Sequence, residues 1–242
     1  MSGSDPALPE GDGGALWAGA RLAVIDPVAT RFARGSTLMT VTRLTARALG
    51  RALGRVEVIG ADRVPPSGGL LLAANHLAFV DGPLLYGVLR RPAVFLTKVE
   101  VFRGIFGSTL RRIGQIPVRR GSAERAPLQA ALATLAAGGV VGVFPEGGRG
   151  NGAVEQMQHG VAYLALRSGC PVVPVACHGT AALFRRRTLR RPPVRVAFGD
   201  PINLPDERRA SRRMIAVAAE DIRAALAAHV AATRPAPPEP PV

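Results

Sequence analysis

Along most of the chain, short runs of apolar residues alternate with stretches whose apolar residues recur every three or four positions. The longer patterns predict helices at about 83–90, 100–112, 123–137, 153–168 and 207–231. The short runs predict seven strands, at 56–59, 70–74, 94–96, 115–118, 140–144, 172–175 and 194–198. We therefore predict an α/β fold, a single domain over residues 56–232 with a mostly parallel mixed sheet flanked by helices.

An N-terminal amphipathic helical segment precedes the first predicted strand. Arginines recur every fourth position at Arg43, Arg47, Arg51 and Arg55, and apolar residues fall broadly on the opposite side. Two interpretations stay open: the helix lies on an anionic membrane, or it packs its apolar side on the domain and leaves the arginines in water. We take residues 15–55 as the candidate membrane-associating segment. Disordered tails are predicted at 1–14 and at the Pro-rich residues 233–242.

Charge and cysteine content narrow the function classes. The 31 basic and 17 acidic residues give a net charge of +14, which predicts anionic partners such as phosphate headgroups, phosphorylated substrates or nucleic acid. Two cysteines are too few for a disulfide framework and match no metal-binding spacing, so we expect a reducing compartment and no metal. The uncharged stretch 126–145 is broken by Gly138-Gly139, and we interpret it as a helix followed by a strand, not as a membrane span.

The sequence NHLAFVD, Asn75–Asp81, directly follows the predicted strand 70–74. A histidine at a strand end can accept a proton near neutral pH if a carboxylate binds its other ring nitrogen. We predict that His76 is a general base and that Asp81 orients it, with a turn joining the two. The alternative is a structural His76, with Asp81 as the N-cap of the next helix.

Three further strand ends carry candidate binding residues. In FPEGGRG, Phe144–Gly150, the glycines allow a ligand to approach the backbone, Arg149 can grip a phosphate, and Glu146 can orient that arginine or bond a substrate hydroxyl. The same letters are also typical of a tight strand-to-helix turn. The other two segments are GQIPVRR at Gly114–Arg120 and VPVACHG at Val173–Gly179.

Taken together, these four segments resemble the glycerolipid acyltransferase family, of the 1-acylglycerol-3-phosphate (lysophosphatidic acid) acyltransferase type. That family carries N-H-x4-D, G-x-I-x-V-x-R, F-P-E-G-T-R-S and V-P-V blocks in this order, and FLTKVE at Phe95–Glu100 looks like its lysine-bearing segment. The resemblance covers about residues 55–200. It implies transfer of a fatty acyl group from acyl-CoA or acyl carrier protein to a lysophospholipid hydroxyl, without a cofactor, at the cytoplasmic face of the membrane. The residues it implies are His76 and Asp81 for catalysis and, for substrate binding, Lys98, Arg120, Glu146, Gly147 and Arg149.

Departures from the family pattern leave the acceptor open. Gly148 and Gly150 stand where the family has Thr and Ser, and His159-Gly160 stands where it has Lys-Gly. A lyso-aminolipid or another lysophospholipid is the alternative acceptor. Two other classes are a basic nucleic-acid-binding module and a catalytically inactive lipid-binding protein. An aromatic content of 5% offers few rings for base stacking, so we expect no nucleic-acid partner, and the presence of His76 and Asp81 argues against an inactive protein.

Overall fold

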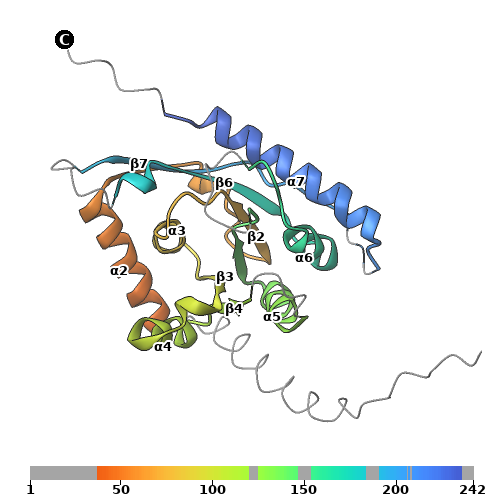
Figure 1. The fold of residues 1–242 in the computed structure, drawn as a ribbon, viewed down its shortest axis with the longest axis horizontal. Coiled ribbons are helices and arrows are strands. Elements are labelled where there is room, and N and C mark those ends of the chain that lie inside the picture. Colours follow the sequence, from red (N-terminus) through yellow and green to blue (C-terminus); the bar gives the residue numbers. More distant parts are fainter. Residues whose placement is uncertain are drawn as a thin grey trace, which may run out of the picture.

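A computed structural model of the chain describes residues 37–119, 125–146, 154–183, 191–205, 207 and 209–235 (Figure 1). Its seven strands form one sheet in the order β1-β7-β6-β2-β5-β3-β4. All neighbours pair in parallel except β6 and β7, which are antiparallel. All seven predicted strands and the mostly parallel mixed sheet are therefore confirmed. The strands are β1 (Arg55–Ile59), β2 (Leu70–Ala74), β3 (Ala93–Lys98), β4 (Ile116–Val118), β5 (Val140–Val143), β6 (Val172–His178) and β7 (Pro193–Phe198).

Helices cover both faces of the sheet (Figure 1). On one face lie α5 (Arg125–Ala136), α6 (Gly160–Ser168) and α7 (Arg212–Ala232), and on the other lie α2 (Thr37–Leu53) and α3 (Asp81–Val88). In the central strand β2, Leu71 and Ala73 face the first layer, while Leu70, Leu72 and Ala74 face the second. Burial on both faces explains why this strand reads as an uninterrupted apolar run.

The predicted helix at 100–112 is divided in the structure. One 3₁₀ turn, Val99–Val101, is followed by a break, and α4 (Gly104–Arg112) begins at Gly104 with a φ of 58°. Gly107 packs against the backbone of Phe102 so closely that a Cβ atom would overlap it. The break therefore follows from the left-handed conformation at Gly104, which sets α4 against the preceding turn.

The predicted helix at 153–168 starts too early. Helix α6 begins only at Gly160, and Val154 has a φ of 54°. The Val154 carbonyl, which a helix would pair with Gln158, accepts from Arg223 Nη1 at 3.3 Å, while the Gln158 N–H donates to the Pro145 carbonyl at 2.8 Å. The helix predicted at 207–231 also starts too early, since α7 begins only at Arg212. Ser211 caps it, because its hydroxyl oxygen accepts the Met214 N–H at 3.2 Å.

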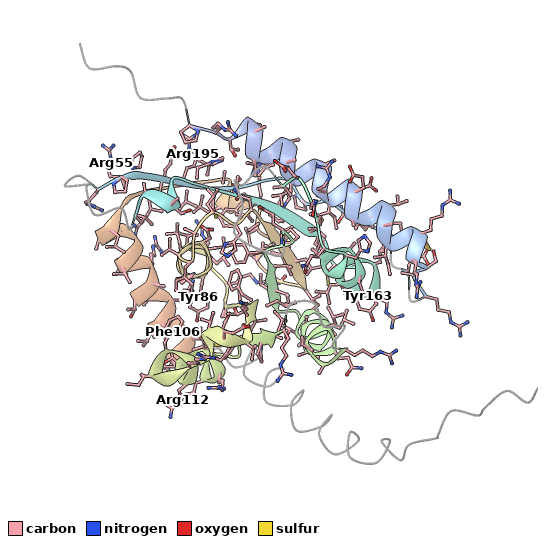
Figure 2. All side chains as sticks on the ribbon, in the orientation of Figure 1. Arg55, Tyr86, Phe106, Arg112, Tyr163 and Arg195 are labelled. Carbon is pink, nitrogen blue, oxygen red and sulfur yellow. The ribbon has the colours of Figure 1, made fainter. Side chains whose placement is uncertain are left out.

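Helix α2 packs on α3 through Tyr86, whose hydroxyl bonds the Met39 carbonyl at 3.0 Å (Figure 2). Arg43 also faces the domain, since its Nη1 donates to the carbonyls of Leu89 and Arg90 at 2.6 and 2.8 Å. Arg55 is the first residue of β1 and lies outside the helix, so the predicted four-arginine ridge is shorter on α2 than its spacing suggested.

The outer side of α2 combines cationic and apolar side chains. Arg47 and Arg51 are exposed, and so are four large apolar residues, with exposed fractions of 38 to 57%. The packing of one apolar side of α2 on the domain agrees with the second interpretation, while a further set of apolar side chains remains exposed. The exposed apolar residues of α2 are Leu38, Val41, Leu44 and Leu49.

Among the described residues, no helix has the length and apolar character to span a membrane. The predicted N-terminal tail at 1–14 and residues 15–36 of the candidate membrane-associating segment lie outside the described residues. The same holds for residues 236–242 of the predicted C-terminal tail.

Candidate active site

Five parallel strands bring the sequence motifs to one edge of the sheet. The carboxyl ends of β2, β5, β6, β3 and β4 meet there, because these strands run in the same direction. His76 follows β2, Glu146 follows β5, Lys98 ends β3 and His178 ends β6. Residues far apart in the sequence thus come together where open α/β sheets bind their ligands.

His76 and Asp81 form a hydrogen-bonded pair at this edge. The His76 Nδ1 and Asp81 Oδ2 atoms are 2.9 Å apart, and the side chains are 14% and 0% exposed. Oδ2 also accepts the backbone N–H groups of Leu77 and Ala78, each at 2.7 Å. The carboxylate therefore holds the turn that carries the imidazole and orients the ring, so that Nε2 is the ring nitrogen that does not contact Asp81.

Asp81 does not act as the N-cap that the sequence allowed. It is itself the first residue of α3, the cap position is Val80, and the helix has no side-chain cap bond. The other oxygen, Oδ1, is buried without a hydrogen-bond partner among the described residues. The described hydrogen bonds of this carboxylate therefore all run through Oδ2, to the backbone of the turn and to His76.

Asn75 fixes the point at which the turn that carries His76 leaves the sheet. Its side-chain amide donates to the Cys177 carbonyl at 3.1 Å and accepts the Cys177 N–H at 2.7 Å. These two bonds imitate one step of β-pairing and continue the β2–β6 ladder for one residue beyond β2. His76 is therefore placed by an anchored residue on one side and by Asp81 on the other.

The ring of Phe144 stacks against the imidazole of His76. The rings of His76 and Phe144 stack with centroids 4.5 Å apart and an interplanar angle of 28°, and Phe144 in turn stacks on Phe95 at 5.9 Å and 19°. The ring of Phe95 lies against Gly142, where a Cβ atom would overlap it. Sequence reasoning placed Phe144 in a motif but missed this role, which depends on β5 lying beside β2.

Glu146 contacts the turn that carries His76 directly. Its Oε1 accepts the His76 backbone N–H at 3.0 Å. The pKa of the Glu146 carboxyl is raised, mainly by burial and also by the charges of Asp81 and Glu155. The hydrogen bond from the His76 backbone opposes this rise. The structure thus joins Glu146 to the His76–Asp81 pair, and the backbone bond through which it does so could not be read from the motif.

The remaining predicted binding residues are only partly placed. Lys98 lies at the same edge of the sheet. Its ammonium forms an ion pair with Glu100, with Nζ 3.5 Å from Oε1. Arg120, Gly147 and Arg149 lie outside the described residues.

In the part of the chain that the structure describes, no three His, Cys, Asp or Glu side chains are grouped in a way that could hold a metal ion. Cys170 and Cys177 are free thiols. Burial raises the pKa of the Cys177 thiol well above its usual value, and the Asp81 charge adds to this, so the thiol stays protonated and is a poor nucleophile.

Comparisons with known proteins show which proteins the chain is similar to. The chain is 26% identical over 155 residues to a 1-acyl-sn-glycerol-3-phosphate acyltransferase of Bacillus subtilis, covering 63% of this chain and 76% of that protein. It is 32% identical over 151 residues to a 1-acyl-sn-glycerol-3-phosphate acyltransferase alpha of Ovis aries, covering 59% of this chain and 53% of that protein. The match thus spans about half the length of the sheep relative.

A solved structure shares the fold. The crystal structure of the 1-acyl-sn-glycerophosphate (LPA) acyltransferase PlsC from Thermotoga maritima matches with a TM-score of 0.59 and 21% identity, covering 91% of this chain and 99% of that chain. The family model described as Acyltransferase matches residues 55–178, which include the strand ends with His76, Asp81 and Glu146. With that match over half of its length, the chain belongs to the acyltransferase family.

Proposed function

We propose that this acyltransferase moves a fatty acyl group from acyl-CoA or acyl carrier protein to the free hydroxyl of 1-acylglycerol-3-phosphate, giving phosphatidate. The observation that carries the proposal is the His76–Asp81 pair, held at 2.9 Å at the edge of the sheet where ligands bind. The names of the bacterial and animal relatives support the choice of acceptor.

In the proposed reaction, His76 acts as a general base and no acyl-enzyme forms. Its Nε2 takes the proton of the acceptor hydroxyl while Nδ1–H remains bonded to Asp81 Oδ2. The oxygen attacks the thioester carbonyl, a C–O bond forms, and the C–S bond then breaks. The departing thiolate receives the proton from the imidazolium, which returns His76 to its neutral form.

The acceptor's phosphate and glycerol are assigned to Arg120, Glu146, Gly147 and Arg149, with Lys98 as a further cation at the same edge. Glu146 supports this assignment, because its carboxylate lies against the backbone of His76 and a substrate held by it would meet the base. Holding two substrates in register supplies a large part of such catalysis. The net charge of +14 suits an acceptor and a donor that are both anionic.

Peripheral attachment to the cytoplasmic face of the membrane accompanies the proposed activity. Helix α2 supports it by carrying exposed Arg47 and Arg51 together with exposed apolar residues, the combination that binds acidic lipid surfaces. We assign Arg43 and Arg55 a smaller share, since Arg43 donates to carbonyls of the domain and Arg55 belongs to β1.

A second acceptor is favoured by one feature of the sequence. Gly148 and Gly150 remove two hydroxyls beside the proposed phosphate site, where the family has Thr and Ser. A lyso-aminolipid or another lysophospholipid is therefore the alternative substrate.

Acyl transfer across a panel of lysolipids, with one labelled acyl thioester as donor, tests the proposal. We expect the fastest product formation with 1-acylglycerol-3-phosphate. Preference for a lyso-aminolipid would select the alternative acceptor, and transfer to no lysolipid would contradict the proposal. Repeating the assay with the same acyl group on coenzyme A and on acyl carrier protein identifies the donor.

A further inference from the structure

Three large apolar side chains are exposed in or near the turn between His76 and Asp81. Phe79, within that turn, is 48% exposed, and Ile105 and Phe106, in the first turn of α4, are 89% and 49% exposed. The rings of Phe79 and Phe106 lie 6.1 Å apart at an angle of 51°, and Figure 2 labels Phe106 on α4. We call these three residues the α4 patch. Single exposed apolar residues are ordinary, but a group of them marks a surface that contacts something.

The fold holds the α4 patch outward. Asp81 draws in the backbone N–H groups of Leu77 and Ala78, so the turn is fixed on its inner side and Phe79 lies on its outer side. The last turn of α4 is tied to the buried residue that precedes the helix, because Arg111 Nη2 donates to the Phe102 carbonyl at 2.9 Å and the guanidinium lies 5.7 Å from the Phe102 ring. The exposure of Ile105 therefore belongs to an anchored helix.

The charge around the patch matches an anionic surface. Helix α4 contains no acidic residue, it ends with Arg111 and Arg112, and the exposed Arg103 precedes it. The nearest acid before it in the sequence, Glu100, pairs with Lys98 at 3.5 Å. Large apolar side chains next to arginines are the combination that enters the interface of an acidic bilayer.

We infer that the α4 patch is a membrane contact separate from α2, which inserts Ile105 and Phe106 into the interface of an anionic phospholipid bilayer. Phe79 connects this contact to catalysis, because it lies between His76 and Asp81 in the sequence and its ring contacts Phe106. Insertion brings the His76 turn to the level of the lipid headgroups. This consequence rests on the proposed function: a lipid acceptor then presents its hydroxyl to the base while its acyl chain remains in the bilayer.

Tryptophan fluorescence tests the inference directly, because Trp17 is the only tryptophan in the sequence. The probe is Ile105→Trp combined with Trp17→Phe, titrated with equimolar phosphatidylglycerol and phosphatidylcholine vesicles whose acyl chains carry bromine. The matched control is Val217→Trp in the same background, since Val217 is also an exposed helical residue, 55% exposed on α7. We expect a blue shift and strong quenching for the Ile105→Trp variant and neither for the control.

Partitioning of two serine variants gives an independent readout. Ile105→Ser removes one large apolar side chain from the contact and is expected to weaken vesicle binding about tenfold. Val217→Ser is expected to leave vesicle binding unchanged.

The results of these experiments distinguish a bilayer from other surfaces that could cover the α4 patch. Equal quenching of the two tryptophan variants, or no vesicle binding, would overturn the inference. Emission of the Ile105→Trp variant that is already blue-shifted without vesicles and unaltered by them would show that the chain itself or a second copy covers the patch, and would also overturn it. None of these readouts requires catalysis. A protein that transfers acyl groups but shows no quenching would therefore refute the α4 contact and leave the proposed function standing.

Discussion

Replacing Asp81 by asparagine isolates the charge of this residue from its role in folding the turn. The amide oxygen of asparagine can still accept the N–H groups of Leu77 and Ala78, which now bond Oδ2 at 2.7 Å. Its NH₂ group would occupy the place of Oδ1, which is buried and has no partner among the described residues. The turn is therefore expected to persist, without the negative charge beside His76.

The loss of rate follows from the geometry. In the proposed mechanism, the His76 imidazolium lies beside a carboxylate whose Oδ2 is 2.9 Å from Nδ1. At an effective dielectric of about 20, opposite charges about 4 Å apart attract by about 4 kcal/mol, which corresponds to roughly a 10³-fold loss of rate. The stability cost of Asp81→Asn is about 1–3 kcal/mol, for one unpaired buried amide group. Asp81→Ala costs about 2–6 kcal/mol, because it leaves two backbone N–H groups unpaired.

Transfer of a labelled acyl group from a thioester to lysophosphatidate measures the rate, and urea unfolding measures the stability. Asp62→Asn is the matched control, since Asp62 is an exposed acid outside the site and its replacement should change neither quantity. Wild-type transfer by a folded Asp81→Asn variant would refute the role given to the carboxylate.

Three further changes test the surroundings of the site. Gly142→Ala places a methyl group against the ring of Phe95, so we expect a stability loss of about 1–3 kcal/mol in urea and slower transfer; unchanged values would contradict the ring stack. Burial raises the pKa of Glu146, so the wild type loses stability as pH rises through that pKa, and Glu146→Gln does not. Above about pH 4.3, the unfolding free energy of the variant should therefore rise relative to that of the wild type. A difference between the two that does not depend on pH would contradict the raised pKa of Glu146. Reversing the charges of Arg47 and Arg51 to glutamate should weaken sedimentation with anionic vesicles about tenfold or more, and unchanged sedimentation would count against α2.

The inner strands β2 and β6 could be predicted from the sequence because they are buried on both faces, whereas the edge strand β1 is largely exposed. Runs such as Leu70–Ala74 contain no polar position, and no helical pattern competes with them. The family resemblance, and with it the enzyme class and the α/β fold, is confirmed by the comparisons. The order of the strands could not be predicted, because no short-range pattern states that β2 lies between β5 and β6.

That missing order explains what sequence reasoning overlooked in the site. The contact of Glu146 with the His76 N–H and the stacking of Phe144 on the His76 ring both join the end of β2 to the end of β5. The pairing of Asn75 with Cys177 similarly joins β2 to β6. Each partner had been noticed within its own motif, and only the sheet brings them into contact.

The predicted start of α6 and the predicted ridge of α2 failed because of contacts between residues far apart in the sequence. The pattern before Gly160 looks helical, but a side chain of α7 bonds the Val154 carbonyl that the first turn would need. In α2, Arg43 reads as part of a solvent-exposed ridge, but it donates to carbonyls of Leu89 and Arg90. Tertiary hydrogen bonds decide both cases, and the local sequence carries no sign of them.

Acyl transfer by His76→Ala tests the central claim most directly. Labelled acyl thioester and lysophosphatidate are incubated with the wild type and the variant, phosphatidate is quantified, and circular dichroism confirms that the variant is folded. We predict phosphatidate formation by the wild type and a loss of about 10²–10⁴-fold in the variant, the contribution typical of a general base. Transfer at the wild-type rate by folded His76→Ala would contradict the account.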